Sequence, residues 1–288
     1  MEWPLLDPTL PRELERRIFE GSAFSKPTTI PNLMLVAQHV EIWVEPLLYH
    51  GVFLSDQDPA VPGFPRYTLD IMLTEINNKP PGFLKHAVKH LFLDVYPRYD
   101  AVQQTASYLD TILKACTGIT SLVAWTGLNG NNLSALASLD SLRRLLIDMQ
   151  DVFGTNPRNC FAHSLFRNIT HLEINEFPYD EFTGIALIPH LTHFSFNDAG
   201  LCAALRPGFH SCAQLTCIIL LCGVAAAKTD VVMAAAQPLL EDGRFVIISQ
   251  SNFRADWYRG VYTGNDYWAL GDAFLAARRA GKVDREQS

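Results

Sequence analysis

The sequence has few of the features that mark secreted, membrane-spanning or disulfide-stabilised proteins. Its 288 residues include six cysteines, and no two of them form a Cys-x-x-Cys pair. The N-terminus, Met-Glu-Trp-Pro-Leu-Leu-Asp-Pro, lacks both a basic start and the long apolar stretch of a secretory signal. The longest apolar run, residues 215–227, has 13 residues, whereas a membrane-spanning helix needs about 20. We therefore expect a cytoplasmic or nuclear protein whose cysteines are buried thiols.

Basic charge and catalytic motifs are also scarce. The chain has 23 Lys and Arg against 30 Asp and Glu, a net charge of −7, which argues against binding to a nucleic-acid backbone. No GxSxG, GxGxxG, GxxxxGK or HExxH string occurs. Cys212, Cys217 and Cys222 are spaced by five, which on a strand places neighbours on opposite faces. We expect no enzymatic activity, no cofactor and no metal site, although distant Ser, His and Asp residues of any chain this long can still assemble into an active site.

What the sequence does contain is a recurring apolar triplet. Each copy has an apolar residue, two variable residues, a second apolar residue, one variable residue and a third apolar residue. The middle positions are 22 to 31 residues apart, and they are Leu91, Leu122, Leu145, Leu172, Phe194, Ile218 and Val246. The alternation at the end of each copy predicts a strand with one buried face. Because a single strand cannot bury that face alone, the copies are expected to stack as parallel strands around a continuous apolar column.

The segments between the triplets supply return elements. Residues 100–116 carry an apolar stripe at helical spacing, and residues 228–240 form a second candidate helix that Pro238 should end early. Asp266 can begin a C-terminal capping helix that runs to about Ala280, with its basic residues in the last turns.

Over residues 85–250 this pattern resembles the leucine-rich-repeat family, whose units of 20–29 residues carry an LxxLxL core. The resemblance implies an irregular solenoid of α/β class with parallel strands. The alternative is an α/β domain whose parallel strands happen to be evenly spaced.

The N-terminal residues predict a short helical unit. Leu10, Leu14 and Ile18 form one apolar stripe on a helix that Pro11 can start. Residues 8–50 resemble an F-box, with Leu10-Pro11-x-Glu13-Leu14 and Ile18-Phe19 at the start and Leu33-x-Leu35-Val36 and Pro46-Leu47-Leu48-Tyr49 at the end. The segment between the two halves is shorter than in that family, with 13 residues from Phe19 to Leu33.

The F-box resemblance implies that the unit binds the Skp-type adaptor of cullin ubiquitin ligases. The residues that would contact the adaptor are Leu10, Pro11, Leu14, Ile18 and Leu33. The alternative is a helical cap that covers the open end of the repeat, and the two roles can coexist.

A protein substrate is expected on the concave face, which the residues alternating with the buried column should form. The predicted contacts are Phe92, Val123, Trp125, Arg144, Leu146 and Glu173. Trp125 can equally be a core or capping aromatic. His90, His171 and His193 share one repeat position and are expected to be solvated, with only the last two adjacent. Cys217, Ile219, Leu221, Phe245 and Ile247 are too apolar to face water, so we expect the C-terminal segment to cover them.

The sequence thus predicts four parts: a helical unit at 1–55, a connecting segment at 56–84, a repeat at 85–250 and a C-terminal cap and tail at 251–288. The implied function is an adaptor that recruits a protein substrate to a cullin-type ubiquitin ligase, without membrane or nucleic-acid partners. The alternative is a repeat scaffold or binding protein without ubiquitin-ligase association.

Overall fold

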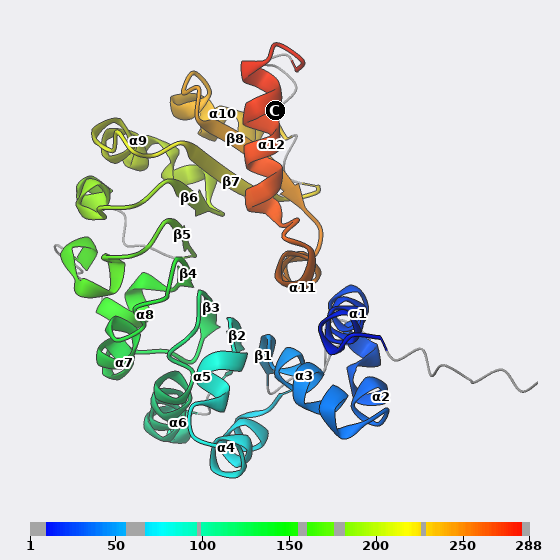
Figure 1. Ribbon diagram of the computed structural model, residues 1–288. Coiled ribbons are helices and arrows are strands. Elements are labelled where there is room, and N and C mark those ends of the chain that lie inside the picture. Colours follow the sequence, from blue (N-terminus) through cyan, green and yellow to red (C-terminus); the bar gives the residue numbers. More distant parts are fainter. Residues whose placement is uncertain are drawn as a thin grey trace, which may run out of the picture.

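The strands of the protein form one sheet in which every strand is parallel to its neighbours. The computed structural model describes residues 10–55, 67–96, 99–154, 160–175, 182–225 and 229–283. Within them eight strands follow one another across the sheet in chain order, and the sheet bends into an arc (Figure 1). The strands are β1 (Gly51–Ser55), β2 (His90–Asp94), β3 (Ser121–Thr126), β4 (Arg144–Ile147), β5 (His171–Ile174), β6 (His193–Phe196), β7 (Cys217–Gly223) and β8 (Phe245–Gln250).

Helices alternate with the strands and lie on the outer side of the arc (Figure 1). They are α4 (Leu69–Asn78), α5 (Phe83–Ala87), α6 (Val102–Ala115), α7 (Leu133–Ala137), α8 (Met149–Phe153), α9 (Cys202–Ser211) and α10 (Asp230–Ala236). The helices predicted over 100–116 and 228–240 correspond to α6 and α10, and a short 3-10 turn, Gln237–Leu239, ends the second at Pro238. No helix in the described ranges has both the length and the apolar character that crossing a bilayer requires.

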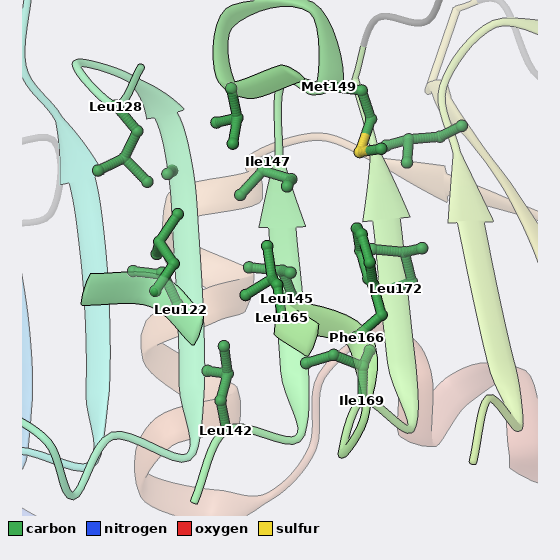
Figure 2. Packing of buried hydrophobic residues seen from close by; sticks show 14 of the residues in the cluster. Leu122, Leu128, Leu142, Leu145, Ile147, Met149, Leu165, Phe166, Ile169 and Leu172 are labelled. Atoms are coloured by element: carbon green, nitrogen blue, oxygen red, sulfur yellow. The ribbon is translucent and has the colours of Figure 1, made fainter. Parts of the chain in front are cut away.

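The predicted apolar column exists and forms the main core between the sheet and the outer helices. Leu91 pairs with Leu122, the register continues to Leu145 and Leu172, and all of these side chains are buried. Figure 2 shows how the neighbouring units place their leucines and isoleucines side by side over Phe166. Each fully buried side chain of this size contributes roughly 1.5–3 kcal/mol of transfer free energy, so the column is the main source of cohesion between units.

A threonine precedes four of the strands and ties each unit to the preceding one. The hydroxyl of each donates a hydrogen bond of 3.0–3.1 Å to a backbone carbonyl of that preceding unit. The four are Thr120, Thr170, Thr192 and Thr216. This threonine ladder fixes the start of the strands along one edge of the sheet.

The expected register of the last strand is wrong by one residue. Ile218 pairs with Phe245, so Phe245 and Ile247 continue the column, whereas Val246 lies on the opposite face. Both faces of β8 are apolar because α12 covers the inner one, and a strand buried on both faces has no alternation that could reveal its register.

The repeat also begins earlier than residue 85. Strand β1 pairs in register with β2, and α4 and α5 occupy the segment expected to be a connection. Tyr49, Val52 and Leu54 fit the triplet pattern, and all three belong to the main core. Gly51 is required there because a Cβ atom would lie 2.7 Å from Val261 Cγ1.

The N-terminal residues form three helices at the β1 edge, α1 (Arg12–Ser25), α2 (Ile30–Met34) and α3 (Gln38–Leu48). Their inner faces share a small core of Ala23, Ile30, Val40 and Val44. Lys79, directly after α4, donates a 2.8 Å hydrogen bond to Glu45 of α3, which links this unit to the first return helix.

Two further helices, α11 (Phe253–Thr263) and α12 (Tyr267–Arg279), lie against the inner face of the sheet. Asp266 caps α12 as expected, since its carboxylate accepts a 3.0 Å hydrogen bond from the Ala269 amide. As predicted, the C-terminal segment covers Cys217, Ile219 and Leu221. Helix α12 therefore covers the inner face of the sheet and does not cap its end.

Candidate functional site

Two surfaces combine accessibility with the chemistry of recognition. We call the first the α1 stripe and define it as Leu10, Leu14 and Ile18. We call the second the edge cleft, a hollow of about 930 Å³ along one edge of the sheet. The cleft is lined mainly by Trp125, Asp148, Gln150, Glu173, Asn175, Asn197, Asp198, Gln250 and Phe253.

The α1 stripe faces away from the protein. Its three side chains are 45–55% exposed; Leu14 and Ile18 lie on α1, whereas Leu10 lies two residues before the helix and not on it as expected. The opposite side of α1 packs Ala23 and Phe19 into the small core. Pro11 precedes the helix, and Glu13 and Glu15 in the first turn suit its positive end. Helix α1 is therefore apolar on its outer side as well as its inner side, and the outer apolar surface is not buried by the rest of the described protein.

Other apolar side chains of the same unit are exposed as well. Leu35, Val36 and Ile42 are 85%, 60% and 65% exposed. Of the five predicted adaptor contacts, Leu10, Pro11, Leu14 and Ile18 are exposed, whereas Leu33 packs partly against the small core. Four of the five are therefore accessible to a partner.

The edge cleft lies where the parallel strands end. Asp148 directly follows β4, Asn175 follows β5 and Asn197 follows β6, so the topology brings the three side chains to the same edge. The carboxyl ends of parallel strands are the usual place for ligands in α/β proteins. Trp125, at the end of β3, and Phe253, at the start of α11, pack with ring centroids 5.1 Å apart and supply an aromatic wall.

The cleft is polar and acidic. Asp148 accepts hydrogen bonds from the amides of Gln150 and Asp151, and Asp198 accepts one from Gly200, so both carboxylates are held in place by helix caps. No Lys or Arg is among its lining residues. Within the described chain, the buried Nε2 of Gln250 has no hydrogen-bond partner, which leaves one donor available to a ligand.

Glu173 lies on strand β5 at the inner end of the cleft and is almost fully buried. The Tyr267 hydroxyl donates a hydrogen bond to its carboxylate. Burial raises the pKa of Glu173 to about 8, and the nearby Asp256 carboxylate acts in the same direction, while the tyrosine hydrogen bond opposes both. The carboxyl group therefore keeps its proton over much of the neutral range.

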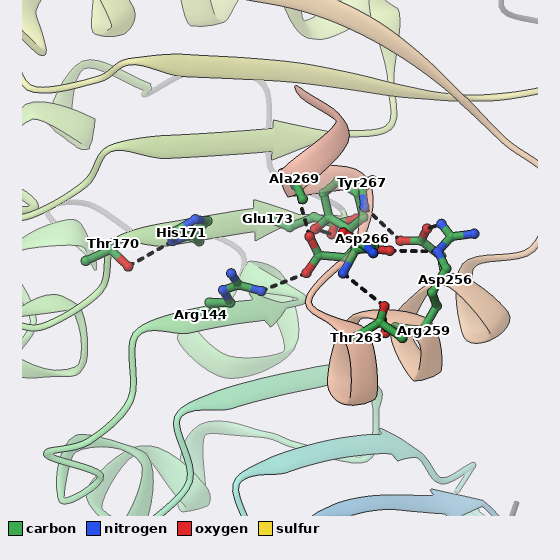
Figure 3. Close-up of polar contacts among 11 residues, drawn as sticks. Arg144, Thr170, His171, Glu173, Asp256, Arg259, Thr263, Asp266, Tyr267 and Ala269 are labelled. Carbon is green, nitrogen blue, oxygen red and sulfur yellow. Dashed lines mark hydrogen bonds and ion pairs between the residues drawn. The ribbon is translucent and has the colours of Figure 1, made fainter. Parts of the chain in front are cut away.

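A polar network joins the α11–α12 junction to the sheet (Figure 3). Arg144 of β4 forms a 2.7 Å ion pair with Asp266, the residue that caps α12. Asp256 of α11 accepts a 3.0 Å hydrogen bond from the Tyr267 amide and forms an ion pair with Arg259. The network fixes both helices over strands β4 and β5.

A buried ion pair anchors the start of α11 to β2. The Asp94 side chain is fully buried and pairs with Arg254. The Arg254 guanidinium carbon also lies 5.4 Å from the centre of the Trp125 ring, within range of a cation–π contact. Trp125 is thus held between Arg254 and Phe253 at the mouth of the cleft.

The six predicted substrate contacts divide into two groups. Trp125 and Glu173 line the cleft, and Arg144 is occupied by its ion pair with Asp266. The expected exposure is wrong for Glu173, which is only 3% exposed, and for the other three contacts, which helix α11 packs over and buries. Those three are Phe92, Val123 and Leu146.

The expected solvation of the histidines is also wrong. Burial lowers the pKa of His90 to about 3 and that of His171 to about 2. The expected pairing of His171 and His193 is confirmed, since their rings stack 4.0 Å apart with an angle of 7° between their planes. The edge of the Trp268 ring system covers this pair from α12.

The other cleft residues, which include Asp148, Gln150, Asn175, Asn197, Asp198, Gln250 and Phe253, are not among the predicted contacts. The polar residue directly after each of β4, β5 and β6 is the available sign for Asp148, Asn175 and Asn197. Phe253 comes from a helix that docks from a distant part of the sequence. Comparison with models of known protein families and with curated proteins finds no match to this chain.

Proposed function

We propose that the protein is an adaptor that recruits a protein substrate to a cullin-type ubiquitin ligase. Helices α1 to α3 bind a Skp-type adaptor as an F-box-like unit, and the leucine-rich-repeat-like solenoid binds the substrate. The observation that supports this best is the α1 stripe, three large aliphatic side chains exposed at the positions where the F-box motif resemblance places adaptor contacts.

The exposed area is large enough to matter for binding. Full burial of one such side chain is worth roughly 1.5–3 kcal/mol, and these three are already about half buried. Covering the stripe therefore yields about 2–4.5 kcal/mol of apolar transfer free energy, a substantial share of a micromolar interaction of about 8 kcal/mol.

A cap for the sheet edge explains the position of α1 to α3 but not the stripe. A cap needs only its inward face, which is the side that carries Ala23 and Val40. The α1 stripe is exposed on the opposite side, so a capping role does not explain why these residues are apolar. Both roles are compatible in one unit.

The edge cleft supports the substrate half of the proposal. Its carboxylates, amides and aromatic wall suit a peptide segment that carries positive charge or several hydrogen-bond donors. The apolar inner face is already filled by α11 and α12, which leaves the cleft as the part of the inner surface that a substrate can reach.

Capture of the full chain on an immobilised Skp-type adaptor tests the proposal. We expect capture of the unchanged chain and its loss in Leu14→Asp and Ile18→Asp. Val231→Asp is the matched control, because Val231 is a similarly exposed aliphatic residue on the distant helix α10. No capture of the unchanged chain, or equal capture of all variants, would reject adaptor binding and favour a scaffold.

A fluorescent-peptide assay tests the cleft separately. Lysine-rich peptides should bind more tightly than glutamate-rich peptides of equal length, and Asp198→Asn should narrow the difference. Equal binding of both peptide sets would contradict the role assigned to the cleft without affecting the adaptor result.

A further inference from the structure

Three potential metal ligands converge where α12 packs on the sheet. His193 opens β6, its register partner Cys217 opens β7, and Asp272 lies on α12. The three ligand atoms all lie within 4.8 Å of one another, and His193 Nε2 is 3.1 Å from Asp272 Oδ1. The group is separate from both the α1 stripe and the edge cleft.

The threonine ladder favours a proton on Nδ1 of His193. Thr192 Oγ1 lies 3.1 Å from the Thr170 carbonyl and donates its proton there, as the other threonines of the ladder do to their carbonyls. With the hydroxyl proton in this position, His193 Nδ1, which is 2.8 Å from the same oxygen, is the donor to it. Thr120 and Thr216 make the same carbonyl bond with no histidine after them, which shows that the bond does not depend on the ring.

The neutral ring consequently has a lone pair on Nε2, and this lone pair faces the Asp272 carboxylate. Two acceptors at 3.1 Å need a positive species between them, either a second ring proton or a metal ion. The Cys217 sulfur is fully buried at the same point and is a third possible metal ligand. A hydrogen bond between His193 and Asp272 does not need this sulfur, whereas a zinc ion commonly binds cysteine sulfur.

The donor set matches zinc in particular. Imidazole nitrogen, thiolate sulfur and carboxylate oxygen are the three donor types of protein zinc sites, with bonds of roughly 2.0–2.3 Å. Such bonds place tetrahedral ligand atoms about 3.3–3.8 Å apart. The nitrogen–oxygen separation of 3.1 Å is close to this range, and the sulfur lies within 4.8 Å of both atoms. The Asp272 side chain is 60% exposed, which gives an ion access from solvent and room for a water molecule as the fourth ligand.

We propose that His193, Cys217 and Asp272 bind a zinc ion that fastens α12 to strands β6 and β7. On binding, the ion takes the place of the thiol proton, which passes to solvent, and the thiolate joins the imidazole and carboxylate as a ligand. The second nitrogen of His193 keeps its hydrogen bond to Thr192, the kind of outer contact that orients histidine ligands. The site thus stabilises the packing of α12 on the sheet and does not depend on adaptor binding.

Titration of the purified full chain with zinc alone, and with cobalt as its spectroscopic substitute, tests the site. We expect one equivalent to bind, with a thiolate-to-cobalt charge-transfer band. Cys217→Ser should abolish the band, whereas Cys222→Ser, a change on the same strand but on the opposite face, should keep it.

Asp272→Asn provides a variant that should fold, because its side chain is largely exposed. It should weaken zinc binding at least as much as the roughly 10–100-fold caused by loss of an outer-shell contact. Circular dichroism would establish that each variant is folded. Absence of zinc binding by the folded unchanged chain would overturn the proposal, as would a cobalt band that persists in Cys217→Ser.

Discussion

Replacement of Gly271 by alanine tests how closely α12 packs on the sheet. A Cβ atom at this position would lie 2.8 Å from Ile219 Cδ1 and 3.2 Å from Cys217 Sγ. The first distance is far below van der Waals contact, and both neighbours are fully buried, so they have little space to move into. We therefore expect Gly271→Ala to destabilise the protein.

The magnitude follows from two opposing effects. Overpacking of a close-fitting core costs typically about 1–3 kcal/mol. The greater helix propensity of alanine returns about 1 kcal/mol. The net loss should be up to about 2 kcal/mol in the free energy of unfolding, measured by urea titration with circular dichroism.

A double mutant isolates the cause. Ile219→Val removes the atom at 2.8 Å and by itself should cost about 0.5–1.5 kcal/mol. Combined with Gly271→Ala it should cost clearly less than the sum of the two single changes, because the overlap no longer exists.

Gly21 provides the control for helix propensity. It lies inside α1, and a Cβ there meets nothing within 4 Å, so Gly21→Ala should stabilise by up to about 1 kcal/mol. If Gly271→Ala stabilised the protein like Gly21→Ala, the packing of α12 described here would be refuted.

Two further predictions concern buried charges. Because burial raises the folded pKa of Glu173 to about 8, the stability that its protonated form provides is complete below about pH 4.5 and is lost as the pH rises toward 8. Glu173→Gln should therefore raise the free energy of unfolding by about 2–4 kcal/mol at pH 8 and by less than about 1 kcal/mol at pH 5. If the stabilities of the unchanged chain and the variant ran parallel from pH 5 to 8, this prediction would be contradicted. Arg254→Met leaves the fully buried Asp94 carboxylate unpaired and should cost about 3–5 kcal/mol, with partial recovery in the double mutant with Asp94→Leu; a cost below about 1 kcal/mol would show that the ion pair is unimportant.

The apolar triplets made the parallel sheet predictable. One-sided burial leaves a period of two in the sequence, and the equivalent leucines of β2 to β5 are paired in the structure. The first strand was missed although Tyr49, Val52 and Leu54 follow the same pattern, because the F-box resemblance had assigned Tyr49 to the end of a helical unit. In β8 the period disappears, since α12 buries the face that would otherwise be polar.

The covering of the inner face was predictable only in part. The apolar character of Ile219 and Leu221, on the inner face of the sheet, indicates that another segment covers them. The same signal in Phe92 and Leu146 was interpreted as a binding surface, because a short apolar patch has the same composition in an interface as in a core. The contacts that decide between them join residues far apart in the sequence, such as Arg254 to Asp94, and leave no local periodicity.

The most direct test of the adaptor proposal is amide hydrogen exchange of the full chain with and without a Skp-type adaptor. The account predicts slower exchange in residues 12–25 when the adaptor is added, with no change in the outer helix at residues 102–115 and no protection of α1 in Leu14→Asp. Unchanged exchange in residues 12–25 at saturating adaptor would contradict it.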